Sequence, residues 1–338
     1  MNGPLKHPPE ATTHQVSNRR PASSLARMQQ ALVLGGVLAA GGWVAWMWGE
    51  SLAWALSGAL LVVLVYALVL ALEFVLAAWV NRSDPAPSAT LAQRLEAWWQ
   101  EAREAPAVFA WRQPFQWRRL PDSEPHGGGA FDGSAAVFIH GFVCNRGFWT
   151  PWMQALRQLG MPYTSVNLEP VFGSIDRGVA LIETAVRQAE ALGSAPPVLV
   201  CHSMGGLAAR AWLASDPRAL ARVEAVITIG SPHHGTWLAH FSHLTNGRQM
   251  QPGNAWLVDL AAKEQALYGA SVHSRFVCWY SHTDNIVFPA STATLAGADN
   301  RHVPATAHVA LGFHPRVMRE SLALLASTAM SPAERTAS

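Results

Sequence analysis

The chain has 338 residues, of which 50% are hydrophobic and 14% are charged, and its formal net charge is +2. This length and composition predict one sizeable globular domain with apolar sequence outside it, and they exclude a disordered or fibrous protein. The absence of a clustered basic run argues against nucleic acid as a partner. The three cysteines, Cys144, Cys201 and Cys278, are too few and too scattered for a disulfide framework or a zinc site.

The stretch from residue 31 to residue 80 is apolar, apart from a break at Gly49-Glu50-Ser51 and a single Glu73. One helix of that length would extend about 75 Å, far beyond a hydrocarbon core of roughly 30 Å. The pattern therefore predicts a transmembrane hairpin of two helices, near 28–48 and 54–80. Glu73 is interpreted as a snorkelling or helix-pairing residue, with an intramembrane functional group as the alternative.

Basic residues flank the hairpin on both sides, while its turn carries only Glu50; they are Lys6, Arg19, Arg20, Arg27, Arg82 and Arg94. Positive charge stays on the cytoplasmic side of a membrane, so both ends of the chain are expected there. This predicts a multi-pass membrane protein with a cytoplasmic C-terminal domain. Alternatively, Arg19-Arg20 and the first apolar run form an export signal that places the domain outside.

Shifts in composition divide the chain into a tail at 1–27, the transmembrane hairpin at 28–80, a linker with an amphipathic juxtamembrane segment at 81–133, a catalytic domain at 134–328 and a flexible tail at 329–338. Apolar residues in the stretch 91–105 recur at helical spacing. Its tryptophans, with those at 111 and 117, are expected either to lie on the bilayer surface, in a helix and a strand, or to pack beneath the catalytic domain.

After Gly133, apolar β-rich runs alternate with helical segments; the predicted strands are 135–139, 163–168, 197–202, 223–229 and 275–281. Candidate helices lie near 149–159, 175–192 and 204–214. This alternation predicts an α/β fold, with a mostly parallel sheet flanked by helices on both faces. The chemistry of such a sheet belongs at the carboxyl ends of its strands.

One strand of this series runs into a helix with Ser203 at the joint, in the sequence Cys201-His202-Ser203-Met204-Gly205. The G-x-S-x-G elbow needs this strand-turn-helix context, because a sharp turn exposes the serine hydroxyl. Cys201 stands where the motif has its first glycine. Alternatively, Ser203 is the N-cap of an ordinary helix. An earlier strand ends in His140-Gly141-Phe142.

These segments, together with Ile229 to Thr236 and the stretch near His308, resemble bacterial lipases and esterases of the α/β-hydrolase superfamily over about the last 200 residues. The resemblance does not include the hairpin. It implies Ser203 as nucleophile, and backbone amides of Phe142 and Met204 as the two donors of an oxyanion hole.

The resemblance also implies the chain order serine, acid, histidine. Asp284 follows a predicted strand in a Ser-x-x-Asp-x-x-Val-x-Pro setting like that of the related lipases, so it is the predicted acid, with Asp299 as the alternative. His308 lies in a loop before a helix and is the predicted base, with His302 and His314 as alternatives. His202 and His233-His234 are expected to be structural.

The sequence thus predicts a membrane-anchored serine hydrolase acting on acyl esters, with lipids as the expected class, in a bacterial inner membrane. Such a hydrolase needs no cofactor and no metal, and the sequence does not identify a protein partner. An insertion near 236–272 is expected to form a cap or lid whose apolar residues shape the acyl pocket; these are Trp237, Leu238, Phe241, Leu244, Trp256 and Leu257. The alternatives are an acyltransferase with the same triad and a catalytically silent membrane scaffold.

Overall fold

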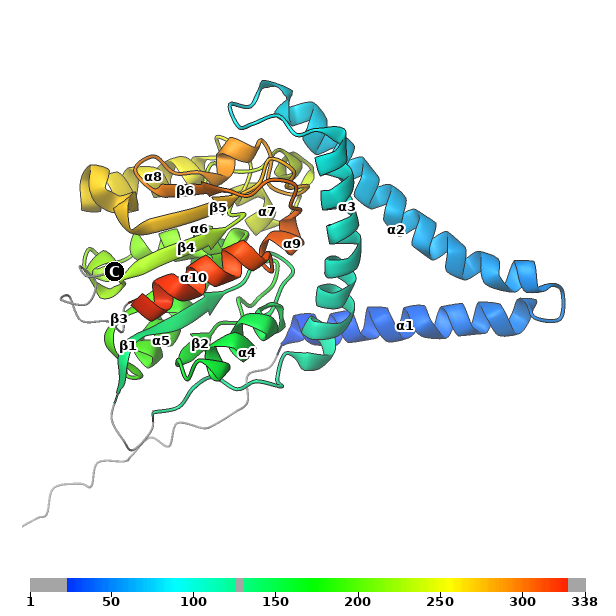
Figure 1. Ribbon diagram of the computed structural model, residues 1–338, viewed down its shortest axis with the longest axis horizontal. Helices are drawn as coiled ribbons and strands as arrows, with labels where there is room; N and C mark the ends of the chain where they lie inside the picture. Colours follow the sequence, from blue (N-terminus) through cyan, green and yellow to red (C-terminus); the bar gives the residue numbers. More distant parts are fainter. Residues whose placement is uncertain (1–22, 126–129, 328–338) are drawn as a thin grey trace, which may run out of the picture.

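The computed structural model describes residues 23–125 and 130–327. A helical N-terminal part comprises α1 (Ser24–Met47), α2 (Leu52–Val80), α3 (Leu91–Pro106) and a π-helical segment, Ala107–Gln116. Helices α1 and α2 project away from an α/β domain and meet at a turn, while α3 lies across their open end against that domain (Figure 1). The predictions for the two tails, including Lys6 and Arg19-Arg20, lie outside the described residues.

Helices α1 and α2 are long and apolar enough to cross a membrane, with mean hydropathies of 1.5 and 2.8. Most of their large apolar side chains are exposed, for example Leu38 and Val75 at 75% and 64%. Within the hairpin the indole Nε1 of Trp43 donates to the Trp54 carbonyl at 3.0 Å. The two helices predicted from the apolar run are therefore present, and their apolar surface is not covered by the other residues that the structure describes.

A six-stranded sheet forms the centre of the α/β domain, in the order β2-β1-β3-β4-β5-β6 with every neighbouring pair parallel. Its strands are β1 (Phe131–Ile139), β2 (Tyr163–Ser165), β3 (Gly193–His202), β4 (Ala225–Ile229), β5 (Phe276–Tyr280) and β6 (Asp299–His302). Strands β1 and β3 are continuous apolar runs near their carboxyl ends, because both faces of a parallel sheet are covered.

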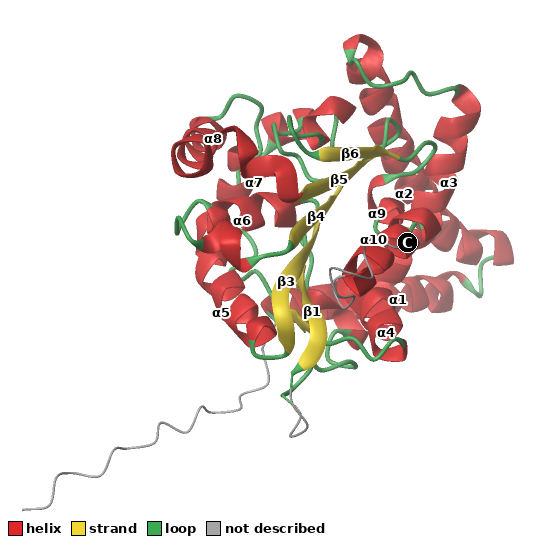
Figure 2. Cartoon of the chain, turned by 60° about the vertical axis from the view of Figure 1, so that its left-hand side comes forward, coloured by secondary structure: helices red, strands yellow, loops and turns green. Residues whose placement is uncertain are grey.

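Helices cover both faces of this twisted sheet (Figure 2). On one face lie α5 (Gly178–Glu190), α6 (Met204–Leu213) and α8 (Ala255–Tyr268), and on the other lie α4 (Thr150–Gln158) and α10 (Pro315–Ser327). Two short helices, α7 (Thr245–Gln249) and α9 (His308–Leu311), lie within the connections between the larger elements. Every residue of α6 is buried, because α5 and α8 flank it on the sheet.

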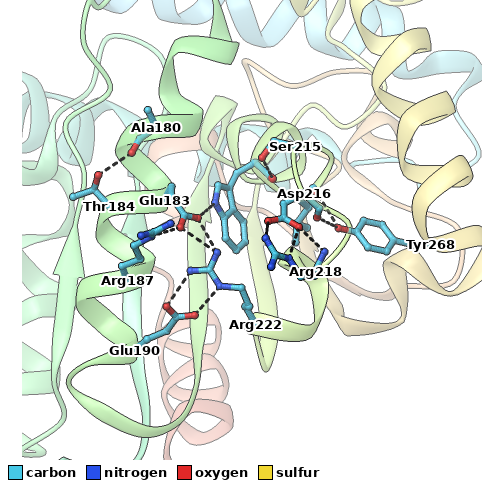
Figure 3. A network of polar contacts seen from close by, with 12 residues as sticks. Ala180, Glu183, Thr184, Arg187, Glu190, Ser215, Asp216, Arg218, Arg222 and Tyr268 are labelled. Carbon is cyan, nitrogen blue, oxygen red and sulfur yellow. Dashed lines mark hydrogen bonds and ion pairs between the residues drawn. The ribbon is translucent and has the colours of Figure 1, made fainter.

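A network of ion pairs near the amino ends of the strands joins α5 to the segment before β4 (Figure 3). Arg222 lies 2.9 Å from Glu183 and 2.8 Å from Glu190, and Glu183 also accepts from the Trp212 indole at 2.9 Å. Burial would raise the pKa of Glu183, but the hydrogen bonds from Arg222 and Arg187 lower it to about 2. This network is at the end of the sheet opposite to Ser203, which follows β3, so it serves the scaffold.

Candidate active site

Ser203 lies between β3 and α6 in a strained backbone conformation, with φ 55° and ψ −130°. A non-glycine residue keeps this backbone conformation only where the surrounding structure fixes it. An added Cβ at Gly205 would collide with the Ile139 carbonyl, and one at Gly206 would collide with Ser231. The glycines thus permit the close approach that a sharp elbow requires.

The Cys201 side chain is fully buried in the core on the α5 and α6 side of the sheet. Its thiol lies away from solvent, and burial raises its pKa far above the usual range. The elbow closes with cysteine at this position, so the glycine of the usual motif is not required for the turn here.

The loop after β1 touches the elbow. A Cβ on Gly141 would lie 2.7 Å from the Cβ of Ser203, so only glycine fits at this approach. Two residues later Val143 has a φ of 52°, again a rare conformation for a β-branched residue. Phe142 follows Gly141 in this loop, and Met204 begins α6, where first-turn amides have no intrahelical partner. The two amides predicted as oxyanion donors therefore belong to the two segments that meet at Ser203.

Asp284 and His308 form a hydrogen-bonded pair, with Asp284 Oδ2 and His308 Nδ1 at 2.9 Å. The other carboxylate oxygen, Oδ1, accepts from the amides of Ile286 and Val287 at 2.8 and 2.7 Å, which fixes the direction of the carboxylate. Gly230 lies against the pair, since a Cβ there would be 3.1 Å from Asp284 Oδ2 and 3.2 Å from His308 Nδ1.

The pKa of His308 is raised from its usual value. Burial lowers it, but the charge and hydrogen bond of Asp284 outweigh burial, with help from the charges of Glu101 and Glu73. The alternative acid, Asp299, is on β6 in an ion pair with Arg301 at 2.7 Å. The alternative base His302 packs against Tyr280 and does not line the cavity at Ser203.

Ser203 and His308 line one cavity of about 310 Å³. Across the described part of the chain, no hydrogen bond joins Ser203 Oγ to the His308 ring. Such contacts are often long without substrate and tighten only in the complex. Also within the described residues, no group of three or more His, Cys, Asp or Glu side chains is placed to hold a metal ion.

The walls of this cavity come in large part from the N-terminal helices. They contribute Tyr66, Val69, Leu70 and Glu73 from α2, and Glu101 and Ala105 from α3. No residue from 236–272 lines it, so the expectation that this insertion shapes the pocket is wrong for this cavity. Instead, Trp237 packs against Trp79 and Phe288, and the Trp256 indole donates to Asp176 at 3.0 Å.

Two carboxylates at the site, Glu101 and Glu73, are not among the predicted catalytic or oxyanion residues. Glu101 lies in the stretch 91–105, for which the sequence predicts only an amphipathic juxtamembrane segment, yet it is only 2% exposed. Glu73 accepts from the amide nitrogen of Asn285 at 2.8 Å, so it binds the α/β domain and its interpretation as a snorkelling or helix-pairing residue is wrong. The alternative, an intramembrane functional group, stays a prediction. For Glu73 the sequence signal is its place as a lone carboxylate inside an apolar helix, which favours a functional group.

The parallel sheet, the elbow after β3 and the loop after β1 together define an α/β-hydrolase fold, as the sequence predicted. Residues 179–287, less than half of the chain, match the family described as "PGAP1-like alpha/beta domain". That region includes Ser203 and Asp284 but ends before His308.

Solved structures of lipases share this fold. The mature form of Bacillus licheniformis lipase BlEst2 superimposes with a TM-score of 0.52 at 17% identity, over 60% of this chain and 96% of the lipase. Aspergillus fumigatus lipase B gives a TM-score of 0.50 at 16% identity, over 61% of this chain and 56% of the lipase. At such low identities the likeness shows the fold alone. No curated protein matches the sequence.

Proposed function

We propose that the chain is a serine carboxylic ester hydrolase, with Ser203 as nucleophile, His308 as base and Asp284 as the acid that orients the base. The observation that carries this proposal is the strained Ser203 elbow, which shares one cavity with the histidine of a buried histidine-aspartate pair. Strain of this kind is concentrated at functional sites, and a raised histidine pKa is typical of a catalytic base.

The geometry supports the following roles. Asp284 accepts the Nδ1 proton of His308, which leaves Nε2 as the basic nitrogen. Nε2 takes the proton from Ser203 Oγ as the oxygen attacks the ester carbonyl, and Asp284 stabilises the imidazolium that results. The amides of Phe142 and Met204 hold the oxyanion, and His308 then returns the proton to the leaving alcohol. Water resolves the acyl-enzyme with His308 again acting as base.

The cavity supports an acyl ester as substrate. Its walls are mostly apolar, with Val69, Leu70 and Phe109 among them, and such walls bind acyl chains. We infer that α1 and α2 anchor the domain in a membrane, because their exposed apolar surface is costly in water. The exposed Leu91, Leu95 and Trp99 of α3 follow at spacings of four residues, as expected of a helix lying at the bilayer surface.

The test of the hydrolase proposal is labelling by a fluorescent fluorophosphonate in membranes, together with turnover of p-nitrophenyl esters of increasing acyl length. The wild-type chain is expected to be labelled and active. Ser203→Ala is expected to lose both signals, whereas Ser215→Ala, which alters an exposed serine at the other end of α6, keeps both. Equal labelling of Ser203→Ala and wild type would disprove the assignment of the nucleophile.

The cytoplasmic position of the catalytic domain rests on the flanking charges, among them Arg27 and Arg82, against the lone Glu50 of the turn. We expect a reporter that functions only in the cytoplasm to be active when fused after Ser338, and one that functions only outside to be inactive. The opposite pattern would overturn this topology and favour an export signal.

A further inference from the structure

His308 is the first residue of the short helix α9, and the preceding Ala307 has no side chain that caps it. The first amides of a helix have no partner within the helix, and burying them unpaired is costly. Here the missing cap comes from another part of the chain. The Glu101 carboxylate accepts from the amide of Val309 at 3.1 Å through both oxygens, and from that of Ala310 at 3.1 Å.

A second carboxylate holds the same loop through Asn285. The amide nitrogen of Asn285 donates to Glu73 at 2.8 Å, and its oxygen accepts from the backbone N–H of His308 at 3.1 Å. Asn285 directly follows Asp284. Glu73 therefore orients a side chain that connects the two residues of the predicted histidine-aspartate pair.

Apolar packing accompanies these hydrogen bonds. One buried cluster joins α2 and α3 to α9. It contains Leu70 and Phe74 of α2, Ala97 of α3, Ala307 just before α9 and Ala310 within it. The histidine loop is therefore packed against α2 and α3. Nothing in the sheet itself contributes to this cluster.

We propose that Glu101 and Glu73 are positioning residues for His308, so that α2 and α3 complete the active site as well as anchoring it. This proposal rests on the proposed function. Glu101 presents its carboxylate to the amino end of α9, where the helix dipole favours negative charge. Neither residue is assigned a bond to substrate.

The same carboxylates act on the charge of His308. The groups that face its ring are Asp284 after β5, Glu101 on α3, Glu73 on α2 and His202 at the end of β3. Burial lowers the pKa of His202 well below its usual value, so it remains neutral. Burial raises the pKa of Glu101, while the charge of His308 and the hydrogen bonds from the two amides lower it. Both oxygens of Glu101 accept amide hydrogen bonds, as an ionised carboxylate does. The negative charges favour the imidazolium form of His308.

The experiment compares full-length Glu101→Ala, Glu101→Gln and Glu96→Ala in membranes, with thermal unfolding measured for each. Glu96 lies on the exposed side of the same helix and serves as the matched control. Glu101→Ala is expected to lower kcat by about 100-fold, because small misplacements of a catalytic group cost about that much. KM is expected to change by less than about threefold, since both carboxylate oxygens of Glu101 are already engaged by the amides of α9.

Glu101→Gln keeps an oxygen that can accept from α9 but removes the charge, so it should recover most of kcat. It should also shift the acid limb of the pH profile of kcat/KM, where activity falls as His308 becomes protonated, to lower pH. The reason is that the lost Glu101 charge stabilises the protonated form of His308. A residue with a merely structural role would not move this limb.

The outcomes separate the two proposals. If wild type is neither labelled by fluorophosphonate nor active, the hydrolase proposal fails. If wild type is active and Glu101→Ala matches Glu96→Ala in kcat, the positioning role is overturned and the hydrolase proposal stands. If Glu101→Ala does not fold, Glu101→Gln decides, and an unchanged acid limb in that variant overturns the positioning role.

Discussion

Replacing His308 by glutamine is expected to lower kcat for p-nitrophenyl ester hydrolysis by about 10⁴-fold or more while leaving the fold intact, a loss on the scale of serine hydrolases that lose their base. Glutamine has no basic nitrogen that can take the proton from Ser203. Asp284→Asn is expected to cost about 10⁴-fold, since an amide in place of Asp284 Oδ2 favours the wrong tautomer of the histidine.

The control for these variants is His302→Gln, which changes a histidine outside the cavity and should retain wild-type kcat. Residues that act as one unit are strongly non-additive. The double variant Ser203→Ala/His308→Gln should therefore be about as slow as either single variant. A histidine variant with kcat within tenfold of wild type, or losses that multiply in the double variant, would contradict the triad.

Replacing Arg210 by methionine is expected to destabilise the chain by about 3–5 kcal/mol, because it leaves a buried carboxylate without its partner. Arg210 on α6 binds Glu264 on α8 through two hydrogen bonds of 2.9 and 2.6 Å, and it donates a third at 2.8 Å to the carbonyl of His233. The charged side chains are 2% and 1% exposed. Denaturant unfolding in detergent, followed by tryptophan fluorescence, measures the loss.

The pH dependence of this loss has a definite sign. Burial raises the pKa of Glu264, but Arg210 and His273 lower it below its usual value overall. Glu264 therefore stabilises the native state at neutral pH, and this contribution is lost as pH falls through its depressed pKa. Without Arg210 that pKa rises, so the difference from wild type should shrink in acid.

Two further variants check the cause. Arg210→Met/Glu264→Leu removes both charges together and should recover much of the stability. Arg218→Ala removes an exposed partner of Asp216 and should produce no measurable change. A loss in the double variant as large as in Arg210→Met would mean that packing, and not the unpaired carboxylate, causes the destabilisation.

The α/β fold was predictable because its signals are local. Strands β1 and β3 have apolar runs near their carboxyl ends, and the elbow motif lies where a strand passes into a helix. The apolar run before residue 80 likewise predicted two helices within a few residues of α1 and α2. Strand β2 is shorter than expected and ends at Ser165, and Ala107–Gln116 is π-helical where a strand was considered.

The cavity was not predictable in the same way. Helical periodicity shows which side of α3 is apolar, but it does not show that Glu101 meets amides more than 200 residues away in the sequence. The pocket was assigned to residues 236–272 because an insertion at that point in chain order usually covers the site. In this chain α2 and α3 already occupy that place, so Leu70 and Ala105 form the wall.

The cap of α9 has a consequence for how this protein can be shortened or recombined. A chain that begins at Gly133 would retain Ser203, Asp284 and His308 but would leave the amides of Val309 and Ala310 facing water. A foreign apolar hairpin in place of the native N-terminal helices would not restore the acceptor for those amides. We therefore expect insertions or deletions in the hairpin that rotate α3 to impair the candidate site as strongly as changes in the loops that carry Asp284 and His308, because the N-terminal helices and the α/β domain build that site together.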